Sequence, residues 1–251
     1  MKKHVWFILL ISGILLTTSY YGTVLAKGGK DREYYETRGD IVWEVPTDSK
    51  VIALTFDDGP DPTYTPQIAQ LLKQYNAKAT FFVVGSRVNK FPEIARQLSK
   101  DQHELANHTY SHPDMRKISS AKLKEEIIKT QEAIFQSTGV NPELFRPPGG
   151  YYSESVVDIA RQAGELVIMW SWHQDTRDWS DPGVKKIVNK VLNNARNGDI
   201  VLFHDYGGNR KQTIQALKQI LPQLQKRGYQ FVTVSELMKR YGKTKKVGKG
   251  D

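Results

Sequence analysis

The sequence predicts an α/β protein whose roughly seven βα units form a single domain, closed or nearly closed like a (β/α) barrel. Two observations predict this class. From Val51 onward, short apolar runs typical of strands alternate with amphipathic runs typical of helices. The alternation continues to about residue 240 without a break in composition, which favours one domain. A doubly wound open sheet is the alternative.

The first 26 residues have the pattern of an export signal. Lys2 and Lys3 precede an apolar run over residues 5–16, and residues 24–26 have the small-residue pattern of a signal peptidase site. An uncleaved membrane anchor is the alternative, although polar residues interrupt the apolar stretch. We therefore expect a secreted, extracellular or cell-wall-associated protein, which touches a membrane only if the segment is retained.

Residues 27–49 are expected to form a linker, residues 50–240 the folded domain and residues 241–251 a basic tail. The first strand is the apolar run that begins at Val51 and ends at the pair Asp57 and Asp58. Further strands are predicted, in order, over residues 79–85, 103–108, 144–146, 166–172, 199–204 and 229–234.

Helices are predicted where apolar residues recur at helical spacing after a capping residue or a proline. The first spans residues 66–75, with Thr65 as its N-cap, and the second begins at Pro92. The remaining predicted helices span residues 119–139, 153–163, 182–195 and 211–226.

Composition narrows the chemistry. The chain has no cysteine, which excludes disulfides, thiolate metal sites and a cysteine nucleophile. Its formal net charge of +9 suits a negatively charged partner. For an exported protein we expect an anionic cell-wall polymer rather than nucleic acid, since no basic and aromatic nucleic-acid signature appears. The alternative is that the positive charge only keeps the protein soluble. We expect the protein to be a monomer.

Polar side chains gather at the ends of the predicted strands. The C-terminal ends of parallel strands share one face of a barrel, so these side chains should meet at one mouth. They are, in chain order, Asp57, Asp58, His108, His112, Arg146, Asp175, Asp178 and His204. Turns after strands are polar, but they seldom select His, Arg and paired Asp so consistently.

His108 and His112 are four residues apart, within reach of a common ion. Loop histidines bonded to the backbone are the alternative for such a pair. Together with one aspartate they would provide three ligands and leave open positions, as in catalytic metal centres. The expected cofactor is one divalent ion, zinc first, with cobalt or nickel as alternatives. The second aspartate can then take a proton from the attacking water, provided that the Gly59-Pro60 turn brings both carboxylates inward.

His204 is the candidate acid that protonates the leaving group, and Asp178 could hold it charged or in the right tautomer. A structural histidine is the alternative. Arg146 could orient Asp57 through a bidentate pair. The turn over residues 147–150 exposes backbone N–H groups that could stabilise an oxyanion. Four aromatic residues near the same mouth, each more often found in a core, would suit stacking on sugars: Tyr151, Tyr152, Trp172 and Trp179.

Residues 50–239 resemble the polysaccharide deacetylase family, carbohydrate esterase family 4. Five motifs occur in the family's order: Thr-Phe-Asp-Asp-Gly-Pro at 55–60, His-Thr-Tyr-Ser-His-Pro at 108–113, Arg-Pro-Pro-Gly-Gly at 146–150, Asp-Thr-Arg-Asp-Trp at 175–179 and Leu-Phe-His at 202–204. The resemblance implies a distorted (β/α) barrel and metal-dependent removal of acetyl groups from sugars.

The resemblance also implies a role for each matching residue. It makes Asp57 the base, Asp58, His108 and His112 the metal ligands, Arg146 the partner of the base, Asp178 the residue that tunes the acid, and His204 the acid. Leu202 and Trp179 would line the acetyl pocket. Gly149 is a departure, because many relatives have tyrosine there. That change keeps a backbone donor but puts a sugar contact in doubt, and Tyr151 is the candidate to replace it.

The expected function is therefore an exported N-deacetylase of β-1,4-linked N-acetylglucosamine polymers, in peptidoglycan or chitin-like oligomers. An O-deacetylase of acetylated xylan would use the same residues. A non-catalytic wall-binding protein of the same fold is a weaker alternative, because the chain keeps both the metal ligands and the base. A phosphoesterase or nuclease would generally need ligands for two ions, and a serine hydrolase is disfavoured because no Gly-x-Ser-x-Gly motif occurs.

Overall fold

The computed structural model describes residues 30–241. The predicted export signal and all but the first residue of the predicted basic tail lie outside these residues. Within the part of the chain that is described, no helix is both long enough and apolar enough to cross a membrane.

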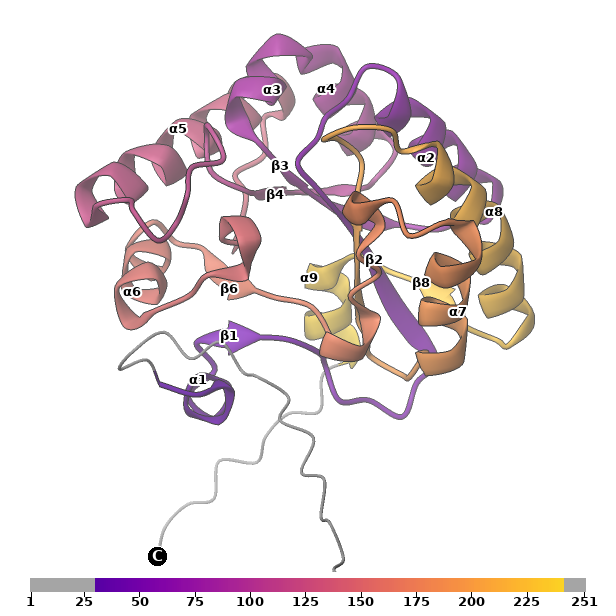
Figure 1. The fold of residues 1–251 in the computed structure, drawn as a ribbon. Helices are drawn as coiled ribbons and strands as arrows, with labels where there is room; N and C mark the ends of the chain where they lie inside the picture. Colours follow the sequence, from indigo (N-terminus) through magenta and orange to yellow (C-terminus); the bar gives the residue numbers. More distant parts are fainter. Residues whose placement is uncertain (1–29, 242–251) are drawn as a thin grey trace, which may run out of the picture.

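A curled sheet of parallel strands forms the centre of the molecule (Figure 1). Its main path has the order β1-β6-β5-β4-β3-β2-β7. The strands are β1 (Ile41–Val42), β2 (Val51–Asp57), β3 (Ala79–Val83), β4 (Glu104–Asn107), β5 (Leu144–Phe145), β6 (Leu166–Ile168) and β7 (Ile200–His204). A short strand, β8 (Gln230–Phe231), pairs with the first two residues of β2.

The two edges of this sheet approach each other. Isolated bridges join Glu44 to Asp199 and Asp175 to Leu202, and Ser171 N–H donates to the carbonyl of Ile200 at 3.0 Å. Scattered bridges, rather than a continuous ladder, therefore link the region of β1 and β6 to β7. This arrangement confirms the predicted distorted (β/α) barrel and makes the open-sheet alternative wrong.

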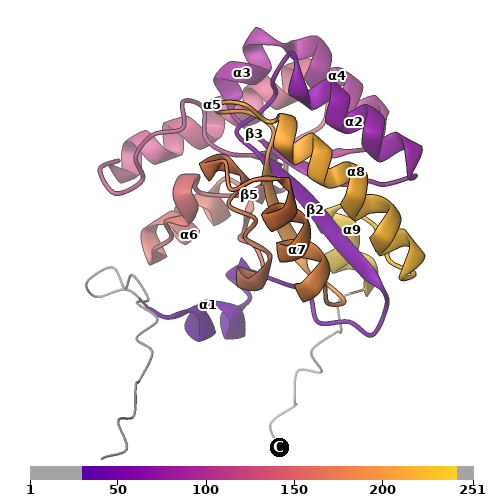
Figure 2. The same cartoon turned by 45° about the vertical axis from the view of Figure 1, so that its right-hand side comes forward.

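Helices cover the outside of the curled sheet (Figures 1 and 2). They are α1 (Arg32–Arg38), α2 (Tyr64–Gln74), α3 (Gly85–Lys90), α4 (Pro92–Lys100), α5 (Ser120–Thr138), α6 (Glu154–Gln162), α7 (Val184–Asn194) and α8 (Lys211–Lys226). The short α9 (Val234–Glu236) instead packs on the inner side of the sheet, where Val234 lies in the same buried cluster as Val51 and Ala53. Ser119 and Ser153 cap α5 and α6 with their side chains, as their positions before amphipathic runs predict.

The predicted N-cap at Thr65 is wrong. Helix α2 begins at Tyr64, two residues before the predicted start, and the Asp61 carboxylate accepts hydrogen bonds from the N–H groups of Thr63 and Tyr64. Thr65 lies inside the first turn, fully buried, and its hydroxyl donates to Asp205. The buried Asp205 carboxylate, which directly follows β7, accepts the hydrogen bond of this hydroxyl, and sequence spacing does not reveal this contact.

Alternation along β2 separates two parts of the core. Ile52, Leu54 and Phe56 face the helices, where the ring of Phe56 stacks between those of Phe81 and Phe203 at centroid distances of 5.0 and 5.6 Å. Ala53 instead packs in the inner cluster. Thr55 and Asp57 lie on that same inner side, so β2 carries its polar residues into the interior of the barrel.

The predicted linker over residues 27–49 is wrong for the part that the structure describes. Residues 32–38 form α1, and β1 pairs in parallel with β6. The side chain of Trp43 is fully buried and that of Tyr35 nearly so. This segment thus supplies one strand of the sheet and part of its hydrophobic core, even though its mixed charge is typical of a connector.

Candidate metal and catalytic site

Asp57 and Asp58 leave β2 in different conformations, which lets both side chains enter the same site. Asp57 is the last strand residue and pairs in register with His204 of β7. Asp58 has a φ of 77°, so the chain departs from the strand at this residue, one position earlier than the predicted Gly59-Pro60 turn. The positive φ breaks the alternation that would otherwise direct neighbouring side chains to opposite faces.

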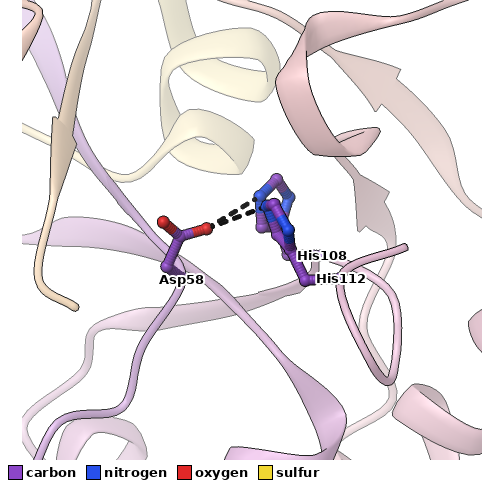
Figure 3. Close-up of side chains that lie close together, drawn as sticks. All are labelled: Asp58, His108 and His112. Carbon is purple, nitrogen blue, oxygen red and sulfur yellow. Dashed lines mark ion pairs between the residues drawn. The ribbon is translucent and has the colours of Figure 1, made fainter. Parts of the chain in front are cut away.

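Asp58, His108 and His112 converge (Figure 3). The Oδ1 atom of Asp58 lies 3.4 Å from Nε2 of His108 and 3.2 Å from Nε2 of His112. Ligand bonds of about 2.1 Å at tetrahedral angles would place neighbouring ligand atoms about 3.4 Å apart. The three residues therefore fit one divalent ion with open coordination positions.

The hydrogen bonds of the β4–α5 loop orient both histidines. Nδ1–H of His108 donates to the carbonyl of Arg146 at 2.8 Å, and because a carbonyl only accepts, Nε2 is left with a lone pair facing Asp58. Within the loop, His112 N–H donates to Thr109 Oγ1 at 3.2 Å. The buried carboxylate of Glu126 accepts from Ser111 N–H at 2.7 Å and from its hydroxyl at 3.0 Å.

Arg146 is fully buried beside Asp57, and its Nη1 donates to Asp57 Oδ1 at 2.7 Å. The predicted bidentate pair is wrong. The other guanidinium N–H groups donate to Thr55 Oγ1 at 2.9 Å and to the carbonyls of Ile168 and Met169 at 3.1 and 2.7 Å. Arg146 thus links β2 to the end of β6 and leaves Asp57 Oδ2 free of this pair, 3.9 Å from His108 Nε2.

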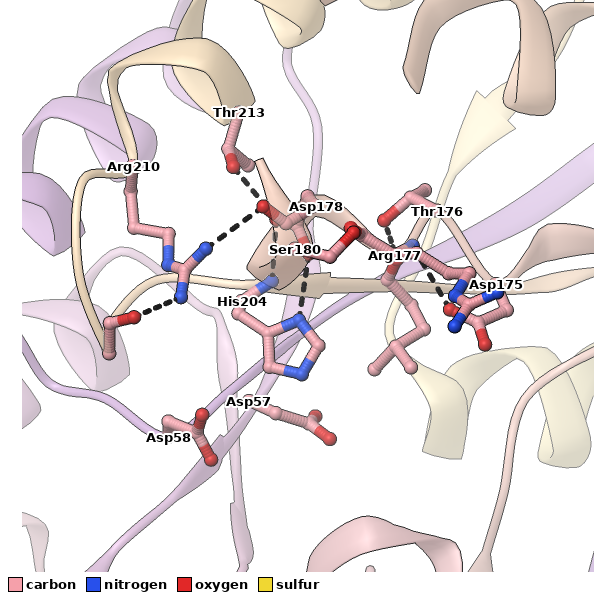
Figure 4. A network of polar contacts seen from close by, with 12 residues as sticks. Asp57, Asp58, Asp175, Thr176, Arg177, Asp178, Ser180, His204, Arg210 and Thr213 are labelled. Atoms are coloured by element: carbon pink, nitrogen blue, oxygen red, sulfur yellow. Dashed lines mark hydrogen bonds and ion pairs between the residues drawn. The ribbon is translucent and has the colours of Figure 1, made fainter. Parts of the chain in front are cut away.

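His204 and Asp178 form the second half of the site. Nδ1–H of His204 donates to Asp178 Oδ1 at 2.7 Å, and its backbone N–H donates to Asp178 Oδ2 at 3.0 Å. Thr213 also donates to Oδ2, at 2.7 Å. Figure 4 shows the imidazole ring between Asp178 and the aspartate pair, so that Nε2 faces Asp57 and Asp58.

The charges of the site shift its pKa values. Burial alone would lower the pKa of His204, but the hydrogen bond and charge of Asp178, followed by the charges of Asp57 and Asp58, raise it to about 9. For Asp58, burial favours the neutral acid, yet hydrogen bonds from His108 and His112 outweigh it and lower the pKa well below the usual range. At neutral pH His204 therefore carries a proton and Asp58 is ionised.

Leu202 and His204 point to the same side of β7, which places the buried Leu202 next to the acid candidate. Trp179 is about half exposed and lies on the turn that carries Asp178. A groove of about 440 Å³ lies next to the metal-ligand candidates, and its walls include Asp58, His112 and Tyr206.

Gly149 lies in a tight turn with a φ of 64°. A Cβ at this position would come within 3.1 and 3.2 Å of ring atoms of Tyr151, so Tyr151 occupies the space that a side chain at 149 would enter. The Tyr151 ring is partly exposed and faces the Arg116 guanidinium at 5.3 Å. Gly150 N–H donates to the carbonyl of Pro147, which leaves the N–H of Gly149 as this turn's candidate oxyanion donor.

Two aromatic residues predicted at the mouth lie elsewhere. Tyr152 packs edge-on against Tyr35 and Trp43, at 5.4 Å from each, and belongs to the core. Trp172 is exposed but lies against Arg32 of α1. Both rings contact residues of the N-terminal segment, and the sequence does not reveal that this segment packs against the barrel.

Comparison with known proteins is consistent with this geometry. A family profile described as polysaccharide deacetylase matches residues 44–168. A peptidoglycan-N-acetylglucosamine deacetylase from Bacillus cereus is 51% identical over 208 residues, which cover 83% of this chain and 97% of the relative. The chain belongs to the polysaccharide deacetylase family.

Solved structures show the same fold for this polysaccharide deacetylase family member. The crystal structure of a peptidoglycan N-acetylglucosamine deacetylase with a bound N-oxidanyl-benzamide superposes with a TM-score of 0.79 at 35% identity, covering 83% of this chain and 97% of that one. A family 4 acetyl xylan esterase from Clostridium thermocellum, solved with a cobalt ion, gives a TM-score of 0.70 at 34% identity, covering 75% and 90%.

Sequence reasoning missed several supporting residues of this deacetylase site. Thr55 and Thr213 bind Arg146 and Asp178, respectively, and Glu126 holds the histidine loop. A signal for Glu126 did exist, because an acid occupies a core-facing position of α5 next to Ile127. Asp205 had none: its fully buried carboxyl packs against Gly59 so closely that a Cβ there would overlap it.

Proposed function

We propose that the chain is an exported, metal-dependent enzyme that removes N-acetyl groups from N-acetylglucosamine residues of peptidoglycan. The observation that carries the proposal is that a metal site, a proton acceptor and a proton donor lie together at one mouth of the barrel. A three-residue divalent-metal site lies beside an ionisable carboxylate, Asp57, and a protonated imidazole, His204, on neighbouring strands. Metal-assisted hydrolysis of an amide uses all three: the ion, a proton acceptor and a proton donor.

A divalent ion held by Asp58, His108 and His112 would supply Lewis-acid polarisation of the acetyl carbonyl and acidify a water molecule. Asp57, held in place by Arg146, takes the proton from the attacking water. The N–H of Gly149 is a donor for the oxygen that becomes negative. His204 gives the proton on Nε2 to the leaving nitrogen while Asp178 holds Nδ1, so that water and the acetamide become acetate and a free amine.

The substrate class is supported by the 51% identical relative, which is named for peptidoglycan N-acetylglucosamine. The exposed Trp179 and Tyr151 suit the faces of sugar rings around the mouth. Zinc is the proposed ion because carboxylate and imidazole ligands in a three-residue site are typical of catalytic zinc. Export rests on the pattern of the first 26 residues.

The deciding experiment incubates the zinc-loaded protein with intact peptidoglycan, chitin oligomers and acetylxylan, and measures acetate together with the mass of each product. We expect loss of acetyl groups from N-acetylglucosamine of peptidoglycan, and none with Asp57→Asn, which keeps the metal ligands. Acetate from acetylxylan alone would instead favour the O-deacetylase, the activity named for the cobalt-bound structural relative. No acetate from any substrate would refute the proposal.

Export is tested separately by cell fractionation. We expect the protein outside the cytoplasmic membrane, with a new N-terminus at Lys27 if the signal is cleaved. Recovery of the full-length chain from the cytoplasm would exclude export without affecting the assignment of the chemistry.

A further inference from the structure

Helices α7 and α8 carry an unbalanced set of basic side chains on the outside of the barrel. Residues 184–198 and 211–231 contain no aspartate or glutamate. The six lysines on the two helices, which we call the basic stripe, are Lys185, Lys186, Lys190, Lys211, Lys218 and Lys226. All are exposed except Lys190, which is partly so.

Helices α7 and α8 lie side by side along their length, so their lysines belong to one two-helix surface (Figures 1 and 2). At one end, Gly183 N–H donates to the side chain of Gln212 at 2.9 Å. At the other, the Arg227 side chain donates to the carbonyl of Leu192. Helix α8 has 16 residues and is therefore about 24 Å long, enough to present charges to several repeats of a polymer.

The charges of the stripe are not neutralised by neighbours. Within residues 30–241, none of its lysines forms an ion pair, in contrast to Lys122 and Lys129 of α5, which both pair with Glu125. Like charges arranged along one face add their potentials, and such a face attracts polyanions and raises their local concentration.

The type of side chain on the stripe selects among polyanions. Neither α7 nor α8 contributes any of the exposed large hydrophobic residues of the described chain, so the stripe has no ring to stack on nucleic-acid bases and no apolar face to enter a bilayer. Lysine ammonium groups are mobile point charges, which suit a flexible chain of phosphates better than a fixed geometry.

We propose that the basic stripe binds an anionic, phosphodiester-linked polyol chain of the cell wall. The choice of a wall polymer rests on the proposed function, because that polymer would lie in the same compartment as the substrate. Helix α8 starts next to Arg210, whose guanidinium donates to the Asp178 carbonyl at 3.0 Å, so one end of the stripe adjoins the catalytic mouth. A polymer bound along it would hold the mouth at the wall.

The test compares two triple variants of the full chain that lose equal charge. The stripe variant is K186Q/K190Q/K218Q, and the control is K100Q/K124Q/K129Q on α4 and α5. Binding to purified poly(glycerol phosphate) is measured over a series of salt concentrations, with duplex DNA of equal phosphate number in parallel. We expect the stripe variant to bind on the order of tenfold more weakly, with the slope of log K against log salt reduced by about 2.

The control should bind the polymer like the wild type, and both variants should release acetate from peptidoglycan fragments that lack the anionic polymer at the wild-type rate. Equal loss in the two variants would refute the stripe, since net charge alone would explain it. So would absence of wild-type binding at about 0.15 M salt, or tighter binding to DNA. Failure of acetate release by the wild type would instead count against the proposed function and leave the binding result standing.

Discussion

Replacing Asp178 with Asn tests how the candidate acid is kept protonated. The hydrogen bond from His204 Nδ1 to Asp178 is 2.7 Å long, and this carboxylate is the first of the groups that raise the pKa of His204 to about 9. Without its charge, burial remains and lowers the pKa. If the pKa returned to 6.5, the protonated fraction at pH 8 would fall from about nine-tenths to about one thirtieth.

We therefore expect kcat/KM of Asp178→Asn to fall about 30-fold at pH 8 from protonation alone, but less than about twofold from this cause at pH 6. The assay is acetate release by the metal-loaded enzyme between pH 5.5 and 10. The alkaline limb should lie at higher pH in the wild type than in the variant, because only the wild type has the charge of Asp178 beside His204. An equal loss at every pH, with the alkaline limb unmoved, would refute this account and leave Asp178 with an orienting role alone.

The same shift has a consequence for stability, which urea unfolding of the metal-free protein measures. The pKa of His204 is higher in the folded state than its ordinary 6.5, so protonation favours folding. This contribution, on the order of 3 kcal/mol, is fully present below about pH 6.5 and is lost as pH rises through about 9. Asp178→Asn should remove that pH dependence; a variant that kept it would contradict the pairing.

Four further substitutions, one of them combined with a second-site change, separate the roles within the site. Asp58→Asn and Asp57→Asn should each lower turnover by about a hundredfold or more. Calorimetric titration with zinc should show a large loss of zinc affinity only for Asp58→Asn. Equal zinc affinities of the two variants would contradict the assignment of Asp58 rather than Asp57 as a metal ligand. Arg146→Met should lower the free energy of unfolding by about 3–5 kcal/mol in urea, because it leaves the Asp57 charge buried and unpaired, and a change below about 1 kcal/mol would contradict that pairing. Gly149→Tyr should lower kcat/KM by crowding the Tyr151 ring, and Tyr151→Ala in the same background should recover part of it; a gain from the single change would show that Tyr151 does not fill that space.

The sequence predicted the ends of β2 and β4 well because each carries two independent signals, whereas the strands predicted over residues 166–172 and 229–234 end at Ile168 and Phe231. Val51–Asp57 is an apolar run that ends in carboxylates, and all seven of its residues are buried. His108 and His112 follow a short strand at a spacing suited to one ion, and their Nε2 atoms both approach Asp58 Oδ1, at 3.4 and 3.2 Å. At these positions the hydrophobic pattern and the type of side chain predict the same location, so the prediction did not depend on contacts between distant segments.

The parts that could not be predicted depend on contacts between distant segments. Trp43 becomes core only because β1 joins β6, more than a hundred residues away, and no periodic pattern marks a strand of two residues. The hydrogen bonds of Arg146 are similar. Two backbone carbonyls at the end of β6 accept hydrogen bonds from the Arg146 guanidinium. Every residue has a backbone carbonyl, so the sequence cannot indicate which carbonyls act as these acceptors.

The in-register pairing of Asp57 with His204 across β2 and β7 sets a fixed spacing between the group that takes a proton and the group that gives one. Both residues are held by main-chain ladders, whereas Tyr151 and Trp179 lie on turns. Evolution can therefore reshape those turns to accept a different polymer without changing how far the proton acceptor stands from the donor. A slip of one residue between the two strands would turn one of these side chains out of the barrel and disable the chemistry in a single step.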